Sequence, residues 1–134
     1  AGLKTNRNYA GSGPVSLAGR TFERSLMLCP AAAPTGGRGQ VTYELTGGLA
    51  KATVLSATIG VDDAVKPNGS VLFIVEVERG GQWEKVFESP VLRGGQSQEI
   101  AVPIAGAARL RLVTTDAGDN IHSDHAVWAA PLLQ

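Results

Sequence analysis

Residues 70–88 read SVLFIVEVERGGQWEKVFE, and this stretch decides the class of fold. Its first part is apolar on both faces and then alternates between apolar and charged residues. Such a pattern is typical of a central β-strand that is covered on both sides at one end. Gly80 and Gly81 separate it from a second run, 82–88, in the manner of a tight hairpin turn. The stretch therefore predicts a β-hairpin within a larger antiparallel sheet.

The same alternation recurs along the rest of the chain, for example in Val41–Leu45 and Glu99–Ile104. The 17 glycines and 7 prolines weaken helix interiors, so we expect no helix longer than two turns. Strands are predicted at about 14–18, 21–28, 40–46, 52–60, 70–78, 82–88, 97–104 and 108–114, with a ninth near 126–133. Many short strands with turns between them predict an all-β sandwich or barrel.

Composition excludes several classes of protein. The 134 residues fit one domain, and 43% apolar residues suffice for one hydrophobic core. Twelve basic and twelve acidic side chains cancel, which argues against a nucleic-acid partner. No apolar run reaches the roughly 20 residues of a membrane span.

The polar N-terminus shows no secretory segment, so we expect either a cytoplasmic start or the removal of a signal or of further chain. Residues 1–13 are taken as an N-terminal extension and residues 14–134 as the domain.

No catalytic motif stands out. The chain has no Gly-x-Ser-x-Gly nucleophile elbow, and its glycine-rich stretches lack the Lys-Ser or Lys-Thr of a phosphate loop. Cys29 could act as a nucleophile with His122 or His125 as its base. Because Cys29 follows an apolar strand, a small buried hydrophobic residue is the favoured interpretation. The protein is therefore predicted not to be an enzyme.

A polar cluster near the C-terminus reads DAGDNIHSDHAVW, residues 116–128. It lies between the last two predicted strands, where a sandwich places loops at one end. Three interpretations stay open. The loop is solvated and its Asp and Asn side chains cap their own turns; or it binds a ligand; or His122 and His125 bind zinc, although the usual ligand context is missing.

Two further sets of residues are candidates for binding. Asp62 and Asp63 follow a predicted strand and could supply oxygen ligands to calcium, or one could accept a hydrogen bond from a backbone amide while the other is solvated. Trp83 and Trp128 are the only tryptophans, and each could form an aromatic platform for a ligand or pack in the core.

The order of the motifs is more specific than any one of them. TFERSL (21–26), VTYEL (41–45), IGVDD (59–63), GSVLFIV (69–75), ARLRL (108–112) and DHAVWA (124–129) follow one another. In this order the chain resembles the NPCBM domain, the carbohydrate-binding module family 51 group of bacterial carbohydrate-active proteins. The resemblance covers about residues 14–133.

The resemblance implies a jelly-roll-like antiparallel β-sandwich whose characterised members bind galactose-containing glycans and often hold a structural calcium ion. It implies a non-catalytic module, stand-alone or part of a larger glycoside hydrolase chain, that recognises a terminal, galactose-like sugar outside the cell or on its surface. The residues expected to bind the sugar are Asp119, Asp124, His125, Trp128 and Trp83. Those expected to bind calcium are Asp62 and Asp63. The side chains expected between the two sheets are Phe22, Leu45, Phe73, Val75, Leu110 and Leu112.

Three positions depart from the pattern of the family. Ser25 stands where glycine is usual, Cys29 where histidine is frequent, and Val127 where an acidic residue precedes the final tryptophan. These departures favour the alternative, a structural or protein-interaction β-sandwich that has lost the sugar site.

Overall fold

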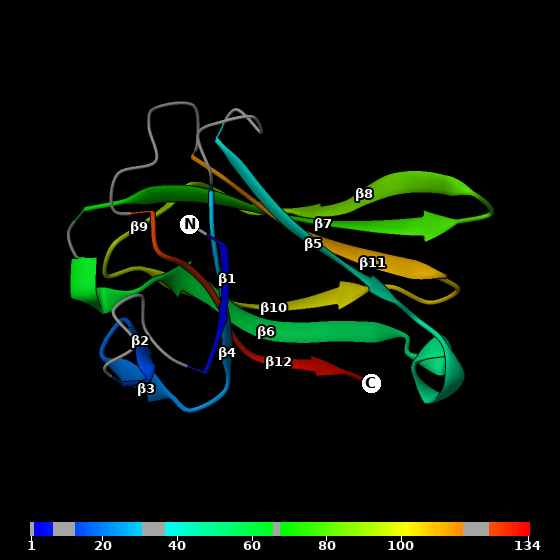
Figure 1. Cartoon of the computed structure of the whole chain (residues 1–134), viewed down its shortest axis with the longest axis horizontal. Coiled ribbons are helices and arrows are strands. Elements are labelled where there is room, and N and C mark those ends of the chain that lie inside the picture. Colours follow the sequence, from blue (N-terminus) through cyan, green and yellow to red (C-terminus); the bar gives the residue numbers. More distant parts are fainter. Residues whose placement is uncertain (1, 7–12, 31–36, 66–67, 117–123) are drawn as a thin grey trace.

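Two antiparallel sheets form the protein, as the computed structural model shows for residues 2–6, 13–30, 37–65, 68–116 and 124–134 (Figure 1). Sheet I has the order β1 (Gly2–Thr5), β4 (Ser25–Cys29), β12 (Ala126–Leu133), β6 (Val54–Val61) and β10 (Ser97–Pro103). Sheet II has the order β5 (Arg38–Glu44), β11 (Arg109–Thr115), β7 (Ser70–Arg79) and β8 (Gln82–Glu88), and β9 (Leu92–Arg93) pairs with the start of β7.

Outside these layers lies a small hairpin of β2 (Val15–Leu17) and β3 (Arg20–Phe22). The helical elements of the described residues are two short 3-10 helices, η1 (Gly47–Lys51) and η2 (Asp63–Val65). The predicted absence of a helix longer than two turns is therefore confirmed for the described residues. No helix within them has the length and apolar character that a membrane crossing requires.

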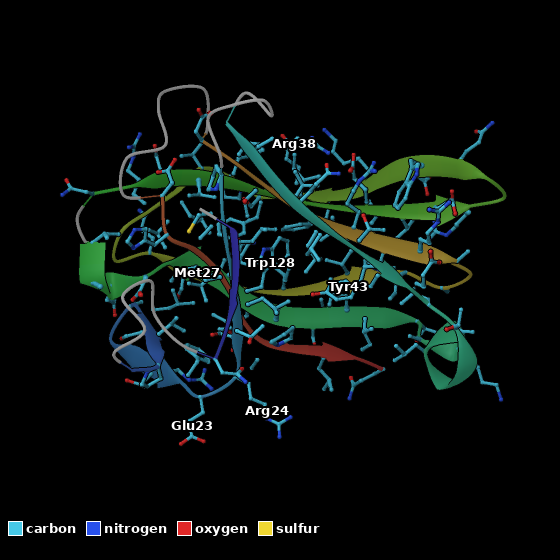
Figure 2. All side chains as sticks on the ribbon, in the orientation of Figure 1. Glu23, Arg24, Met27, Arg38, Tyr43 and Trp128 are labelled. Atoms are coloured by element: carbon cyan, nitrogen blue, oxygen red, sulfur yellow. The ribbon has the colours of Figure 1, made fainter. Side chains whose placement is uncertain are left out.

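The main core lies between the two sheets because alternate residues of each strand point inward. Phe73 of β7 meets Trp128 of β12 there, with ring centroids 5.3 Å apart in an edge-to-face arrangement. Figure 2 shows Trp128 between the two layers. The predicted core residues Leu45, Phe73, Val75, Leu110 and Leu112 all belong to this cluster.

Phe22 is buried elsewhere. A second cluster lies on the outer face of sheet I, where the β2–β3 hairpin covers it. It consists of Val15, Leu17, Phe22, Met27, Cys29, Val127 and Ala129. The prediction that Phe22 lies between the sheets is wrong, because the alternation in a strand says that a side chain is buried but not against which neighbour.

The strand pattern is otherwise close to the prediction, with three differences. The run expected at 21–28 is divided at Glu23 and Arg24 into β3 and β4. The short strand β9 was not expected. Residues assigned to an N-terminal extension contribute β1, which pairs with β4 at the edge of sheet I. The start of the chain thus belongs to the sandwich.

Candidate functional site

Residues from three strands meet at the end of the sandwich where β6 ends and where β7 and β12 begin. Asp62 follows β6 and His125 precedes β12, and the antiparallel pairing of these strands places the two residues side by side. The backbone N–H of Asp62 donates to the carbonyl oxygen of His125 at 2.9 Å. Asp124 Oδ1 accepts a hydrogen bond of 2.8 Å from the backbone N–H of Ser70, the first residue of β7. We call Asp62, Asp63, Ser70, Asp124 and His125 the polar end.

Asp124 holds two strands together. Its side chain is only 1% exposed, and the hydrogen bond from Ser70 joins the start of β7 in sheet II to the start of β12 in sheet I. A buried backbone amide without a partner would cost free energy, and Asp124 provides that partner. The carboxylate is thus buried, and its Oδ1 fixes the start of β7 beside the start of β12.

His125 is the half-buried member of the polar end. Burial lowers its pKa because the charged form loses hydration, and the nearby Asp62 carboxylate opposes that shift. The imidazole is therefore neutral at pH 7, and its Nδ1 is buried. A neutral ring nitrogen can exchange a hydrogen bond with a sugar hydroxyl. Asp119 and His122, the other polar candidates of the loop before β12, lie outside the described residues.

Asp63 anchors the β2–β3 hairpin. Its Oδ1 accepts from the backbone N–H of Ala18 at 2.9 Å, and its Oδ2 accepts from Gly19 N–H at 2.8 Å and from Ser16 Oγ at 2.7 Å. These three hydrogen bonds fix the turn of the hairpin to the first residue of η2. Both carboxylates of the Asp62–Asp63 pair accept hydrogen bonds from backbone amides, and Asp62 is 2% exposed, so the expectation that one of the two is solvated is wrong.

Asp62 differs from its neighbour. Its Oδ1 accepts from Ala64 N–H at 3.2 Å, whereas its Oδ2 is buried and has no hydrogen-bond partner among the described residues. A buried carboxylate oxygen of this kind fits a cation, since an unpaired charged oxygen is otherwise costly. Calcium takes six to eight oxygen ligands. The described residues hold no group of three or more His, Cys, Asp or Glu side chains arranged for a metal. Asp62 therefore fits as a single carboxylate ligand, but Asp63 is already used by the hairpin.

The two tryptophans do not join the polar end. Trp128 is 0% exposed and lies in the main core, so its prediction as a sugar-stacking residue is wrong for the described structure. A tryptophan that stacks on a sugar must point to solvent. Trp128 instead pairs with Ile59 on the inner face of sheet I, where both side chains belong to the main core. Its indole N–H is buried and has no hydrogen-bond partner among the described residues.

Trp83 lies at the opposite end of β7. It pairs across the strands with Glu78, whereas Ser70 of the polar end begins the same strand. Eight residues of a strand span about 26 Å, which exceeds the size of one sugar ring. The guanidinium of Arg111 lies 3.9 Å from the centre of the Trp83 ring and covers one of its faces. Trp83 therefore cannot serve the same sugar as His125.

An ionic network surrounds Trp83 on the outer face of sheet II. Glu76 Oε1 accepts from Arg111 at 2.7 Å and from Arg38 at 3.2 Å. Glu78 accepts from both Nε and Nη2 of Arg109 at 2.8 and 2.9 Å, and this pairing raises the pKa of Arg109. The sequence gives no sign of this network, because it depends on the register between β7 and β11.

The departures from the family pattern are buried. Cys29 and Val127 both belong to the cluster under the hairpin, and Ser25 is 2% exposed. None of the three side chains lies on the surface where a sugar could touch it. The burial of Cys29 also agrees with its interpretation as a small hydrophobic residue.

The fold and the polar end define a two-sheet antiparallel β-sandwich with polar groups gathered at one end. The chain belongs to the NPCBM/NEW2 domain family, whose family model matches residues 2–134. The match includes β1, in agreement with its place in sheet I. A search of curated proteins found no match.

Solved structures with the same fold are carbohydrate-binding modules of family 51. One is the CBM51 module from Clostridium perfringens GH95, in complex with methyl-galactose; it is 25% identical, with a TM-score of 0.80, over 100% of this chain and 89% of that chain. Another holds the M60 catalytic domain and the CBM51-1 and CBM51-2 domains from Clostridium perfringens ZmpB; it is 27% identical, with a TM-score of 0.80, over 99% of this chain and 13% of that chain.

A third shares the fold at lower identity. The CBM51-2 and INT domains of ZmpB, with GlcNAc bound to CBM51-2, are 21% identical, with a TM-score of 0.78, over 99% of this chain and 28% of that chain. The jelly-roll-like β-sandwich is thus confirmed, and this chain matches one module of those larger proteins.

Proposed function

We propose that this protein is a non-catalytic carbohydrate-binding module that recognises a terminal, galactose-like sugar of a glycan. The observation that carries the proposal is the match over the whole chain to a module solved with methyl-galactose. Its family membership supports the same class of function.

His125 is the residue of the polar end that we propose to contact the sugar. Its half-buried, neutral imidazole can exchange hydrogen bonds with hydroxyl groups. Asp124 precedes it directly and fixes the start of β12 through Ser70. Asp124 is thus a positioning residue in this proposal. Few contacts are available in an open site of this kind, so the affinity for a single sugar is expected to be weak.

A glycan array followed by calorimetry tests the proposal. We expect retention of galactose-terminated glycans, and saturable heat on titration with methyl-galactoside. His125→Ala should lower the affinity about fivefold or more, because it removes one polar partner. Glu88→Ala, at an exposed position of β8, is the matched control and should bind as the unchanged protein does. Equal affinity for all three proteins would place the sugar elsewhere on the sandwich.

The second candidate is a structural or protein-interaction sandwich without a sugar site. The observation that favours it is the state of the predicted aromatic platforms, since Trp128 is buried and Trp83 is covered on one face by Arg111. Binding of any sugar on the array excludes a purely structural role. A folded protein that retains no glycan supports this second candidate.

Calcium and cellular context complete the proposal. We propose that Asp62 contributes a carboxylate oxygen to a structural calcium ion, on the basis of its buried Oδ2.

Two of the solved structures with this fold are larger chains, and the match to this protein covers only 13% and 28% of their length. That supports a module carried by a larger enzyme chain outside the cell or on its surface.

A further inference from the structure

A groove lies on the outer face of sheet I, beside the edge of the β2–β3 hairpin. The hairpin covers one half of this face, where Leu17 lies against Gly60, and leaves the other half open. The groove has a volume of about 360 Å³. Its lining includes Arg20, Phe22, Ser56, Thr58, Glu99 and Ala130.

The pairing of three strands places polar groups on its floor. Thr58 of β6 pairs with Glu99 of β10 on one side and with Ala129 of β12 on the other. All three side chains belong to the outer face, because Ile59 and Ile100 next to them belong to the main core. A β-bulge follows Ala129, where Ala130 has a φ of 49°. Ala130 lines the groove and has no atoms beyond Cβ, so β12 leaves space there.

The polar side chains of the groove make no hydrogen bonds or ion pairs with other described residues. Among the described residues, the side chains of Arg20, Ser56, Thr58 and Glu99 have no hydrogen bond or ion pair with the protein. The guanidinium of Arg20 lies 4.7 Å from the centre of the Phe22 ring, which holds it at the wall of the groove. The outer face of sheet II differs, since its three arginines pair with Glu76 and Glu78.

We propose that this groove is a second carbohydrate-binding surface that takes a neutral hexose. Its volume is in the range of small-molecule sites, about 300–1,000 Å³. One guanidinium and one carboxylate cancel in charge, which favours a neutral ligand over an anion or a cation. Glu99 can accept from two neighbouring hydroxyls, Arg20 can donate, and the two hydroxyl side chains can do either. Ala130 and the edge of Phe22 suit the apolar face of a sugar ring.

The groove is separate from the polar end. Asp62 lies four positions after Thr58, just beyond the end of β6, which is a distance of about 13 Å at the rise of a strand. The hairpin fills the outer face between them, where Leu17 lies against Gly60. The proposal rests on the proposed function for the class of ligand, and it adds a surface that the proposed function does not use.

A titration followed by ¹H–¹⁵N NMR separates the two surfaces. Methyl-galactoside and, in a second series, N-acetylglucosamine are added to tens of millimolar. The backbone amides of Thr58 and Glu99 report on the groove, and those of Ser70 and His125 report on the polar end. We expect saturable shifts at the groove with at least one of the two sugars.

Two conservative variants and two matched controls show whether the groove itself binds. Thr58→Val and Glu99→Gln keep the side-chain shape and should each lower the affinity of the groove about tenfold. Thr42→Val, on an exposed position of β5, and Glu23→Gln should leave it unchanged. Figure 2 shows Glu23 pointing away from the body of the protein. Dispersed spectra confirm that each variant is folded, and Glu99→Gln alone decides if Thr58→Val is not.

The outcomes distinguish this inference from the proposed function. Shifts confined to Ser70 and His125 would overturn the groove and leave the sugar-binding module intact. Shifts at the groove that both variants leave unchanged in affinity would also overturn it. Shifts nowhere, with either sugar, would overturn the groove together with the proposed galactose-like specificity.

Discussion

Asp124 illustrates, at the scale of single residues, why a polar cluster in the sequence does not reveal its use. The sequence places it in a group of Asp and His residues that suits ligand binding. Its partner, Ser70, lies 54 positions away, and only the fold brings the two together. The same holds for Asp63, whose hydrogen-bond partners are 44 to 47 positions distant. The residue types are visible in the sequence, but their partners depend on the pairing of distant strands.

Replacing Asp124 should therefore affect stability. Asp124→Ala leaves the buried N–H of Ser70 without its acceptor, and we expect a loss of about 1–3 kcal/mol in the free energy of unfolding. Asp124→Asn keeps an acceptor oxygen and should lose less. Urea unfolding of the three proteins measures the difference. Equal stability of the alanine and asparagine variants would contradict the positioning role of Asp124.

His125 should make stability depend on pH. Its pKa in the folded protein is lower than the ordinary histidine value of 6.5, so the unfolded chain binds more protons between these two values. The contribution of this group is therefore constant above about pH 6.5 and is lost as the pH falls through the folded pKa. Thermal unfolding from pH 8 to pH 5 measures it. His125→Gln should lose less stability over this interval, and parallel curves for the two proteins would contradict the burial of the imidazole.

At the scale of elements, the strands that the sequence predicts are those with a long alternating pattern. For β7, β8 and β12 the predicted and observed bounds agree within one residue. The four-residue β1 and the two-residue β9 are too short to show a period, and they form because a neighbouring strand offers free backbone groups. The hairpin was predicted as strands, but the sequence does not show that it packs outside sheet I.

The hairpin should depend on Asp63. Asp63→Ala removes the acceptor of three hydrogen bonds to Ser16, Ala18 and Gly19, and we expect a loss of about 1–3 kcal/mol. Hydrogen exchange should become faster at the amides of Ala18 and Gly19. Glu23→Ala, at an exposed position just after the hairpin, serves as the control. Unchanged exchange at both amides would show that the hairpin does not depend on the hydrogen bonds of Asp63.

Calcium should act on the same region through Asp62. Protein stripped of metal is expected to melt at a higher temperature after calcium is added, because the ion binds the folded state preferentially. EDTA should reverse the rise, and Asp62→Asn should abolish it. A melting temperature that does not change with calcium would leave the buried Oδ2 of Asp62 without this explanation.

At the scale of the whole molecule, three surfaces have different roles. The outer face of sheet II is occupied by ion pairs, the polar end combines structural carboxylates with His125, and the groove on sheet I has uncommitted polar groups. The order of motifs in the sequence was sufficient to predict the family and the sandwich. It was not sufficient to find the groove, whose lining comes from four strands that are far apart in the chain.

Binding of a sugar by this sandwich is tested most directly by calorimetric titration of the folded protein with methyl-galactoside. We expect a saturable isotherm of weak affinity, with a dissociation constant on the order of 0.1–10 mM, since a single sugar makes few contacts. A flat isotherm up to about 50 mM methyl-galactoside, together with a glycan array that retains nothing, would contradict sugar binding.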